Sequence, residues 1–225
     1  AFGRYPSTSY KTSAEEWSST QPVGAWTTST AVNTGRYAAA SAGANAEAAL
    51  YYGGTTPPVS ALAEQWNGSS WTEVADLNTA RDGISGNGTS TSALGYGQDN
   101  PARSGKTESW AGSSWTEVSD LNTERRQGGG LGADNESALA FGGENPSTDN
   151  IADTEQWNGS SWTEVNNLNT ARLNIVGTGI VTAGIAVGGR VVPPGSLKSQ
   201  TEQWNGSTWT EVGDTNTARY YSYGS

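Results

Sequence analysis

Carboxylates that could serve as a catalytic acid and base recur at regular intervals along this chain. One set stands two positions before a tryptophan and comprises Glu15, Glu64, Glu108, Glu155 and Glu202. A second set stands two positions after another tryptophan and comprises Glu73, Glu117, Glu164 and Glu211. Glycoside hydrolysis needs two carboxylates in different environments that converge on one bond. Because equivalent positions of a repeat are spread around the molecule, we expect both sets to have structural roles and assign no catalytic residue.

Arginines recur in the same way, each at the end of an Asn-Thr-x-Arg motif. The five positions are Arg36, Arg81, Arg125, Arg172 and Arg219. They could form a cationic ring for an anionic ligand, or each could tie a loop to the fold. We favour the second interpretation, in which the arginines pair with the recurrent glutamates or with backbone carbonyls.

Short motifs around asparagine and aspartate admit simpler explanations than a bound group. Asn67, Asn158 and Asn205 begin Asn-Gly-Ser motifs and are formal glycosylation acceptors, as is Asn87 in Asn-Gly-Thr. The first three also fit hairpin turns, in which Asn-Gly supplies positive φ angles. Acidic loop residues such as Asp99 lack the spacing of a calcium-binding loop, so no metal site is predicted.

Composition excludes several classes of function. The chain has 225 residues with no Cys, no His and no Met, so the usual zinc, copper and haem ligands and histidine triads are missing. We expect no cofactor. The formal net charge of -10 argues against a nucleic-acid partner, because phosphate binding depends on Lys and Arg. The most apolar run, residues 175–189, is too short and too rich in glycine for a membrane span.

Tryptophan marks an internal repeat. Only 33% of the residues are hydrophobic, yet 10 are Trp. They form five pairs: Trp17 with Trp26, Trp66 with Trp71, Trp110 with Trp115, Trp157 with Trp162, and Trp204 with Trp209. Successive first tryptophans are 44 to 49 residues apart, a period typical of propeller blades.

Each repeat reads as four short strands, because alternation, aromatic content and glycine turns are β-like and no helical period appears. The sequence therefore predicts an all-β, five-bladed β-propeller of four-stranded blades in one domain, residues 1–225. The predicted blades are residues 36–80, 81–124, 125–171, 172–218, and a fifth that joins 219–225 to 1–35. Joining the two termini in one blade closes the ring and removes open sheet edges.

The spacing of each Trp pair predicts that its two indoles lie together. In a two-residue Asn67-Gly68 hairpin Trp71 lies diagonally across from Trp66, and in a four-residue turn the two face each other. Between Trp17 and Trp26 the loop is longer by four residues, an even number, so the side-chain parity is kept. We expect the Trp pairs, rather than charges, to hold each blade to its neighbour.

Together these features resemble the kelch repeat: an Arg, an apolar strand that ends in Gly-Gly such as ALAFGG, a Glu-x-aromatic strand, and a later Trp. The resemblance implies a β-propeller and covers essentially the whole chain. It departs from the usual pattern in two ways, since Trp stands where kelch repeats usually have Tyr and five blades are fewer than usual. The NGSSWTEV units also resemble repeats of long virion and bacterial surface proteins, which implies a virion or extracellular location.

Length variation points to the binding surface. The distance from the first Trp to the Arg is 15 residues in four copies, whereas the distance from the glycine turn to the first Trp ranges from 12 to 15. The loop between the second and third strands is therefore variable, and it emerges on the same face as the Asn-Thr-x-Arg crossings. Residues near these loops that break the repeat are the expected ligand-binding residues: Arg103, Lys106, Asp149, Arg190 and Lys198.

From this pattern we expect a non-catalytic binding or display module that recognises a protein or a carbohydrate through the variable-loop face. We further expect a monomeric domain of a longer protein. The alternatives are a glycoside-acting enzyme of the five-bladed type and a purely structural spacer. A non-repeated carboxylate cluster in one deep pocket would favour the enzyme.

Overall fold

The computed structural model describes residues 14–18, 25–193 and 195–220, with the backbone alone for 14–18 and 25–27. All the regular secondary structure in these residues is β-strand. The described part of the chain therefore contains no helix that could cross a membrane.

Sixteen strands form four antiparallel sheets of four strands, here named blades 1 to 4. Blade 1 contains β3 (Ala40–Asn45), β4 (Ala48–Tyr52), β5 (Ala63–Trp66) and β6 (Trp71–Val74), and blade 2 contains β7 (Ser85–Gly88), β8 (Ala93–Gln98), β9 (Ser104–Trp110) and β10 (Trp115–Val118). Blade 3 contains β11 (Gly129–Leu131), β12 (Ala138–Phe141), β13 (Thr154–Trp157) and β14 (Trp162–Val165), and blade 4 contains β15 (Val176–Ile180), β16 (Ala183–Val187), β19 (Thr201–Trp204) and β20 (Trp209–Val212). Two strand pairs stand outside these sheets: β1 (Ala14–Ser18) with β2 (Ala25–Ser29), and β17 (Arg190–Val191) with β18 (Ser196–Leu197).

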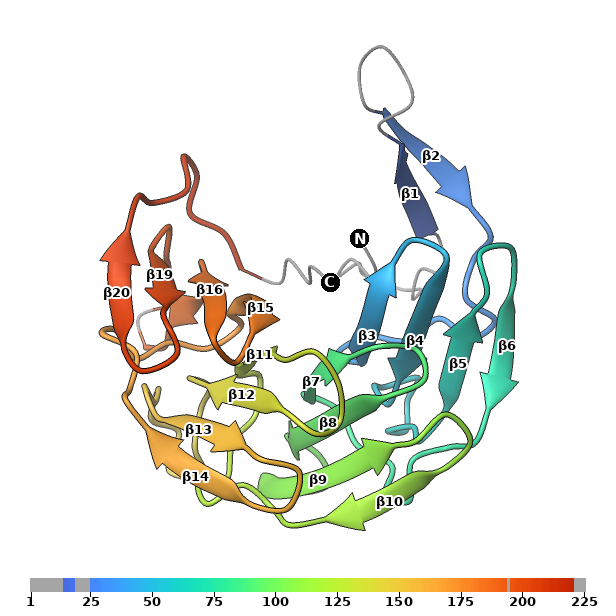
Figure 1. Cartoon of the computed structure of the whole chain (residues 1–225), viewed down its shortest axis with the longest axis horizontal. Helices are drawn as coiled ribbons and strands as arrows, with labels where there is room; N and C mark the ends of the chain where they lie inside the picture. Colours follow the sequence, from blue (N-terminus) through green and yellow to red (C-terminus); the bar gives the residue numbers. More distant parts are fainter. Residues whose placement is uncertain (1–13, 19–24, 194, 221–225) are drawn as a thin grey trace.

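The blades are arranged around a common axis, with their first strands innermost. Strands β3, β7, β11 and β15 lie side by side in that order, and blade 4 and the β1–β2 pair stand at the two ends of the arc (Figure 1). The prediction of an all-β propeller with four-stranded antiparallel blades is confirmed. The described residues contain four complete blades and one two-stranded fragment.

In the four complete blades the turn between the two tryptophans has four residues, which decides between the two predicted registers. Trp66 lies directly opposite Trp71, and Trp17 lies opposite Trp26 in the longer hairpin. Within the turn, Asn67 Oδ1 accepts the backbone N–H groups of Ser69 and Ser70, both at 3.0 Å. The expectation of positive φ at both turn residues is wrong for Asn67, since Gly68 alone has it, at 91°. Asn is favoured here because its side chain closes the turn by hydrogen bonding.

In every complete blade the two indoles of the pair contact each other. The ring centroids are 5.5 Å apart for Trp66 and Trp71, 5.4 Å for Trp110 and Trp115, 5.5 Å for Trp157 and Trp162, and 5.2 Å for Trp204 and Trp209. All eight side chains are buried. The clusters of buried residues place the Trp pairs of blades 2, 3 and 4 against the second strand of the preceding blade.

The second indole of a pair carries much of this contact between blades. Trp115 packs on Tyr52 of blade 1 with centroids 4.7 Å apart, and Trp162 packs on Tyr96 of blade 2 at 5.0 Å. One buried indole contributes roughly 5 kcal/mol from about 200 Å² of area before entropy is counted, whereas an exposed ion pair contributes roughly 0 to 1. The geometry thus agrees with the prediction that tryptophan joins the blades.

Glycine in the inner strands makes room for these aromatic side chains. A Cβ at Gly86 would stand 2.0 Å from the Tyr52 hydroxyl oxygen. That hydroxyl donates to the carbonyl of Leu94 in the next blade at 2.7 Å, and burial raises the pKa of Tyr52. Around the axis the inner strands line a small, partly open space of about 120 Å³.

Blade 4 carries an element that the repeat pattern did not predict. Its longest variable loop folds into the hairpin β17–β18. The hairpin is held by backbone hydrogen bonds between Leu173 and Arg190 and by the side chain of Asn150 in blade 3, which accepts from the N–H of Val192 at 3.1 Å. The loop between β16 and β19 has room for a hairpin because it is longer than the corresponding loops of blades 1 to 3.

The third strands differ at one position, where Thr107 of blade 2 accepts a hydrogen bond from the next blade and Ala63 of blade 1 cannot. This difference gives a testable prediction. The indole N–H of Trp162 donates to Thr107 Oγ1 at 3.2 Å, whereas Trp115 Nε1 is buried without a partner because Ala63 stands at the equivalent position. Ala63→Thr should therefore raise the free energy of unfolding by about 1 kcal/mol, and Thr107→Ala should lower it by about 1 to 2 kcal/mol. Guanidinium denaturation measures both. Two unchanged midpoints would mean that the indole bond adds nothing to stability.

Candidate functional site

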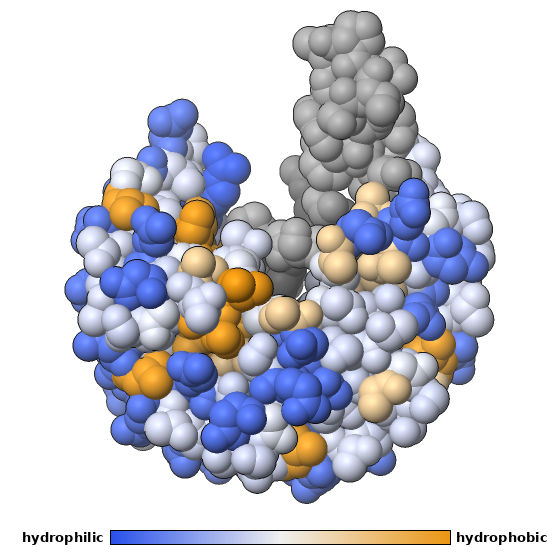
Figure 2. Space-filling view, viewed as in Figure 1, coloured by the Kyte–Doolittle hydropathy of each residue, from blue (hydrophilic) through white to orange (hydrophobic). Residues whose placement is uncertain are grey.

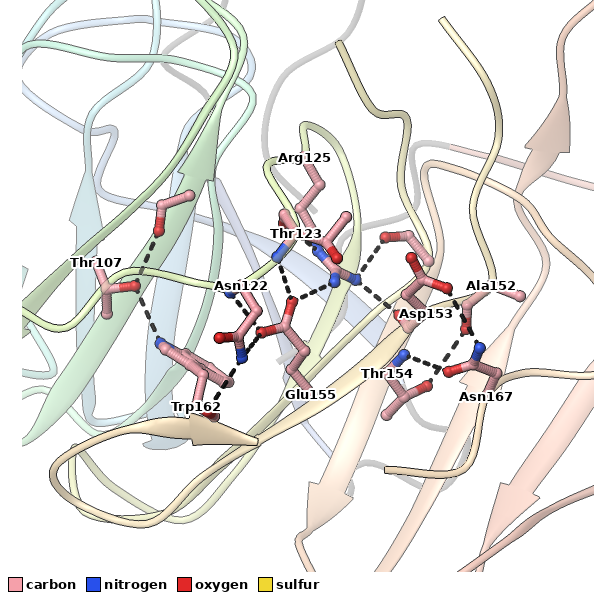
Figure 3. A network of polar contacts seen from close by, with 12 residues as sticks. Thr107, Asn122, Thr123, Arg125, Ala152, Asp153, Thr154, Glu155, Trp162 and Asn167 are labelled. Carbon is pink, nitrogen blue, oxygen red and sulfur yellow. Dashed lines mark hydrogen bonds and ion pairs between the residues drawn. The ribbon is translucent and has the colours of Figure 1, made fainter. Parts of the chain in front are cut away.

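The recurrent arginines and glutamates meet in buried nodes between neighbouring blades (Figure 3). In the node that joins blades 2 and 3, Arg125 Nη2 lies 2.6 Å from Glu155 Oε1. The same carboxylate accepts the backbone N–H groups of Asn122 at 2.7 Å and Thr123 at 3.1 Å. The Asn-Thr-x-Arg crossing is thereby fixed to the third strand of the following blade.

Three further nodes repeat this arrangement. Arg36 pairs with Glu64 at 2.6 Å, Arg81 with Glu108 at 3.2 Å, and Arg172 with Glu202. Burial lowers the pKa of Arg81 and Arg125, although their glutamate partners oppose this effect. Removing one partner of a buried pair leaves an uncompensated charge, so each node depends on both residues.

The geometry gives neither glutamate set the arrangement of a catalytic pair. In the nodes, the carboxylates are buried and their oxygens face arginine and backbone N–H donors. The second set lies on the outermost strands, where Glu73, Glu117, Glu164 and Glu211 are exposed, one in each blade. Members of the two sets, such as Glu155 and Glu164, stand opposite each other on adjacent strands, and this pairing is repeated in every complete blade.

The fifth arginine differs from the other four. Arg219 is exposed, and its Nε donates to the carbonyl of Thr217 at 3.3 Å. The four paired arginines are 0 to 1% exposed. The Glu15 side chain, which is the fifth glutamate of the set, lies outside the described side chains.

At one end of the axis, on the variable-loop face, a chain of backbone hydrogen bonds links the blades. Gly83 N–H donates to Ala38 at 2.9 Å, Gln127 N–H to Gly83 at 2.9 Å, and Asn174 N–H to Gln127 at 2.7 Å. All four residues have positive φ, between 52° and 65°. Each stands two positions before an inner strand, so together they surround the axis and define what we call the mouth.

The side chains beside the mouth do not repeat from blade to blade. The residue before each mouth residue forms a backbone hydrogen bond with a residue of the variable loop. From blade 1 to blade 4 these pairs are Tyr37 with Thr55, Asp82 with Asp99, Arg126 with Glu144, and Leu173 with Arg190. The same two positions therefore carry different chemistry in each blade. This contrasts with the nodes, in which the same two residue types recur.

An ion cluster occupies the mouth between blades 2 and 3. Arg126 lies 2.5 Å from Asp99 and 2.7 Å from Glu144, and Arg103 lies 3.1 Å from Glu144. Burial acts to lower the pKa of Arg126, but its hydrogen bonds with Glu144 and Asp99 outweigh burial and raise it. The Asp99, Arg103 and Arg126 side chains are each 16 to 24% exposed, so solvent reaches this cluster.

The predicted ligand-binding residues occupy different places on this face. Arg103 belongs to the ion cluster, and Lys106 lies 3.5 Å from Glu117 on blade 2. Asp149 is exposed in the β12–β13 loop. Arg190 begins the β17–β18 hairpin and Lys198 follows it. Arg190 Nε donates to Asn174 Oδ1 at 3.0 Å, and the Arg190 guanidinium lies 5.2 Å from the Tyr220 ring centre.

Sequence reasoning missed Asp99, Arg126 and Glu144 as members of one cluster. Each lies in a different loop, and Asp99 was considered only as a calcium ligand. A signal was present, because aligning the repeats on their arginines places Asp82 and Arg126 in the same column as Tyr37. The pairing of that column with Glu144 required the structure.

Comparison with known proteins supports the fold. No protein-family model matches the chain, and no curated protein sequence matches it. Among solved structures, the chain is similar to YjhT, with a TM-score of 0.77 over 93% of this chain and 80% of the YjhT chain. At 12% sequence identity this similarity shows the β-propeller fold alone.

The nodes predict an asymmetry between two glutamates that stand opposite each other on adjacent strands. Glu155→Gln should lower the free energy of unfolding by about 3 to 5 kcal/mol, because it leaves the buried Arg125 without a counter-charge. The control Glu164→Gln, at an exposed position, should change stability by no more than about 0.5 kcal/mol. Urea denaturation of the two variants is the measurement, and equal losses would contradict the structural role of the node.

Proposed function

We propose that this chain is a non-catalytic binding or display module whose ligand, a protein or a carbohydrate, docks on the variable-loop face around the mouth. One observation carries the proposal. The positions beside the mouth differ in every described blade, whereas the nodes and Trp pairs that build the frame recur. A purely structural ring has no need of such variation at one end of its axis.

The electrostatics of the face support recognition rather than catalysis. Asp99 and Glu144 stand at equivalent positions of blades 2 and 3 and lie close together, but both are held by Arg126. A catalytic pair needs carboxyl groups that can reach one scissile bond, whereas the oxygens of these two carboxylates are engaged by Arg126 and Arg103. Partly exposed arginines with fixed partners are well suited to hydrogen bonding with a docked ligand.

We also propose that the frame is a kelch-like ring of five blades, with the fifth built from both ends of the chain. The support is the fifth Trp pair and the fifth copies of the node residues, Glu15 and Arg219. Strands β1 and β2 already pair in the register of the outer strands of a complete blade. A closed ring presents the variable loops as one continuous rim.

Binding at the mouth is tested with labelled protein on glycan and peptide arrays. We expect at least one ligand, and we expect Arg126→Ala with Glu144→Ala to weaken it by at least about tenfold, because the pair is removed without leaving one buried charge. The matched control is Glu47→Ala with Glu136→Ala, two exposed residues in hairpin turns on the opposite face. Thermal unfolding of both double variants verifies that they are folded.

Three outcomes would contradict the proposal. Silent arrays would favour the spacer, and a ligand unaffected by the mouth variant would place recognition elsewhere. Turnover of chromogenic glycosides by the wild-type protein would support the glycoside-acting enzyme.

A further inference from the structure

Three hairpin turns carry an asparagine that the turn itself does not require. Each joins the third and fourth strands of a blade and begins with Asn67, Asn158 or Asn205, followed by glycine. Blade 2 has Ala111 at this position. Its turn still closes with a backbone hydrogen bond from Ala111 to Ser114 at 3.3 Å, the same length as in the other three turns. Because the turn forms without asparagine, the carboxamide can be considered for its own chemistry.

Each of these carboxamides receives at least three hydrogen bonds on its oxygen. Asn67 Oδ1 accepts the backbone N–H groups of Ser69 and Ser70, both at 3.0 Å, and the Ser69 hydroxyl at 2.9 Å. The oxygens of Asn158 and Asn205 have the matching donors at 2.9 to 3.0 Å. Donors at about 2.7 to 3.1 Å are the arrangement by which an oxyanion hole stabilises negative charge on a carbonyl oxygen. The turn is therefore suited to a carboxamide carbon under nucleophilic attack.

The nucleophile is the backbone nitrogen of the glycine that follows. Its attack on Asn67 Cγ closes a five-membered ring, so the two reacting groups belong to one molecule and are held close together. A Cβ at Gly68 would have the Glu47 carbonyl oxygen as its nearest described neighbour, at 3.5 Å. Asn67 and Gly68 are both exposed, and hydrophilic residues cover the place in Figure 2 where Figure 1 shows the β5–β6 turn. Water and hydroxide can thus reach the amide.

The fourth Asn-Gly pair, Asn87 with Gly88, lies in a different environment. Asn87 is 6% exposed, and its Nδ2 donates to the carbonyl of Asp134 at 2.8 Å. Its Oδ1 has no hydrogen-bond partner among the described residues. A Cβ at Gly88 would stand 2.2 Å from the Ser92 carbonyl oxygen, so the backbone is tightly enclosed here. The same dipeptide therefore occurs in this chain in an activating setting and in a protected one.

We propose that Asn67, Asn158 and Asn205 are sites of self-modification, at which the turn promotes cyclisation to a succinimide. The Gly68 nitrogen loses its proton to hydroxide and bonds to Asn67 Cγ, while negative charge collects on Oδ1. The Cγ–Nδ2 bond then breaks, and the nitrogen takes up a proton from water and leaves as ammonia. Water opens the ring at either carbonyl, which gives aspartate or isoaspartate. The net change at each site is one water consumed and one ammonia released.

Each reaction adds one carboxylate to the face opposite the mouth. Gly68 lies beside Glu47 in the turn between β3 and β4, whereas the mouth residues stand before the first strand of each blade. The reaction changes the charge of one face and leaves the other as it is. It goes beyond the proposed binding function and does not depend on it.

Peptide mapping by mass spectrometry, after storage of the folded full-length protein in mildly alkaline buffer, tests the three sites. We expect aspartate and isoaspartate at Asn67, Asn158 and Asn205, with Asn87 intact. The control is the same protein unfolded in urea, in which Asn87 should react as well. The proposal is overturned if Asn67 stays intact in the folded protein, or if Asn87 reacts there as fast as Asn67.

Two variants test the role of the turn. Ser69→Ala removes one donor and should slow the reaction at Asn67 about fivefold, the effect of one neutral hydrogen bond, while Asn158 in the same molecule keeps its rate. Ala111→Asn gives blade 2 the same Asn-Gly-Ser-Ser turn and should create a fourth reactive site. An unchanged or faster reaction at Asn67 in the first variant, or an inert turn in the second, would contradict promotion by the turn.

Discussion

The stacking of each tryptophan pair on the preceding blade is the interaction on which the rest of the structure depends. A single blade has indoles on one face and, in blades 1 to 3, a leucine with a large aromatic residue on the other, so it cannot bury both faces alone. Contacts such as Trp162 on Tyr96 bury one face of each neighbour together. Stability in such a repeat is approximately a sum over neighbouring interfaces. This explains how a chain with only 33% hydrophobic residues builds a continuous core.

Around these apolar contacts, the buried Arg–Glu nodes fix the position of each crossing. Taking a charged pair out of water is costly, and an apolar replacement is often as stable, so the nodes are better explained by geometry than by strength. Glu155 holds the backbone of Asn122 and Thr123 as well as Arg125. The crossing therefore follows one path from blade to blade, and the mouth residues arrive at equivalent positions around the axis. A rigid frame of this kind allows the loops to vary without altering the fold.

The contrast between frame and mouth carries the functional reasoning. The recurrent charges lie inside the nodes, whereas the cluster around Arg126 has no counterpart between the other described blades, and its Asp99 and Arg126 side chains remain within reach of solvent. The residues that repeat and the residues that vary thus lie in different parts of each blade. The same comparison between equivalent positions identifies the incomplete flank of blade 4, since Ile185 and Arg219 are exposed where their counterparts are buried.

Periodicity alone determined the strand class, the Trp pairing and the recurrence of the Arg and Glu positions, because these properties depend on spacing along one strand or turn. The sequence places Asn67 in a turn, but it fits a two-residue turn and a four-residue turn equally well. Only the structure shows that the turn has four residues. Only the tertiary structure decided which arginine meets which glutamate, that Arg126 joins Asp99 to Glu144, and that the longest loop forms β17–β18. Those contacts join residues from different strands, loops or crossings that lie far apart in the sequence. Their distances are set by how blades pack around the axis, which no local pattern in the chain records.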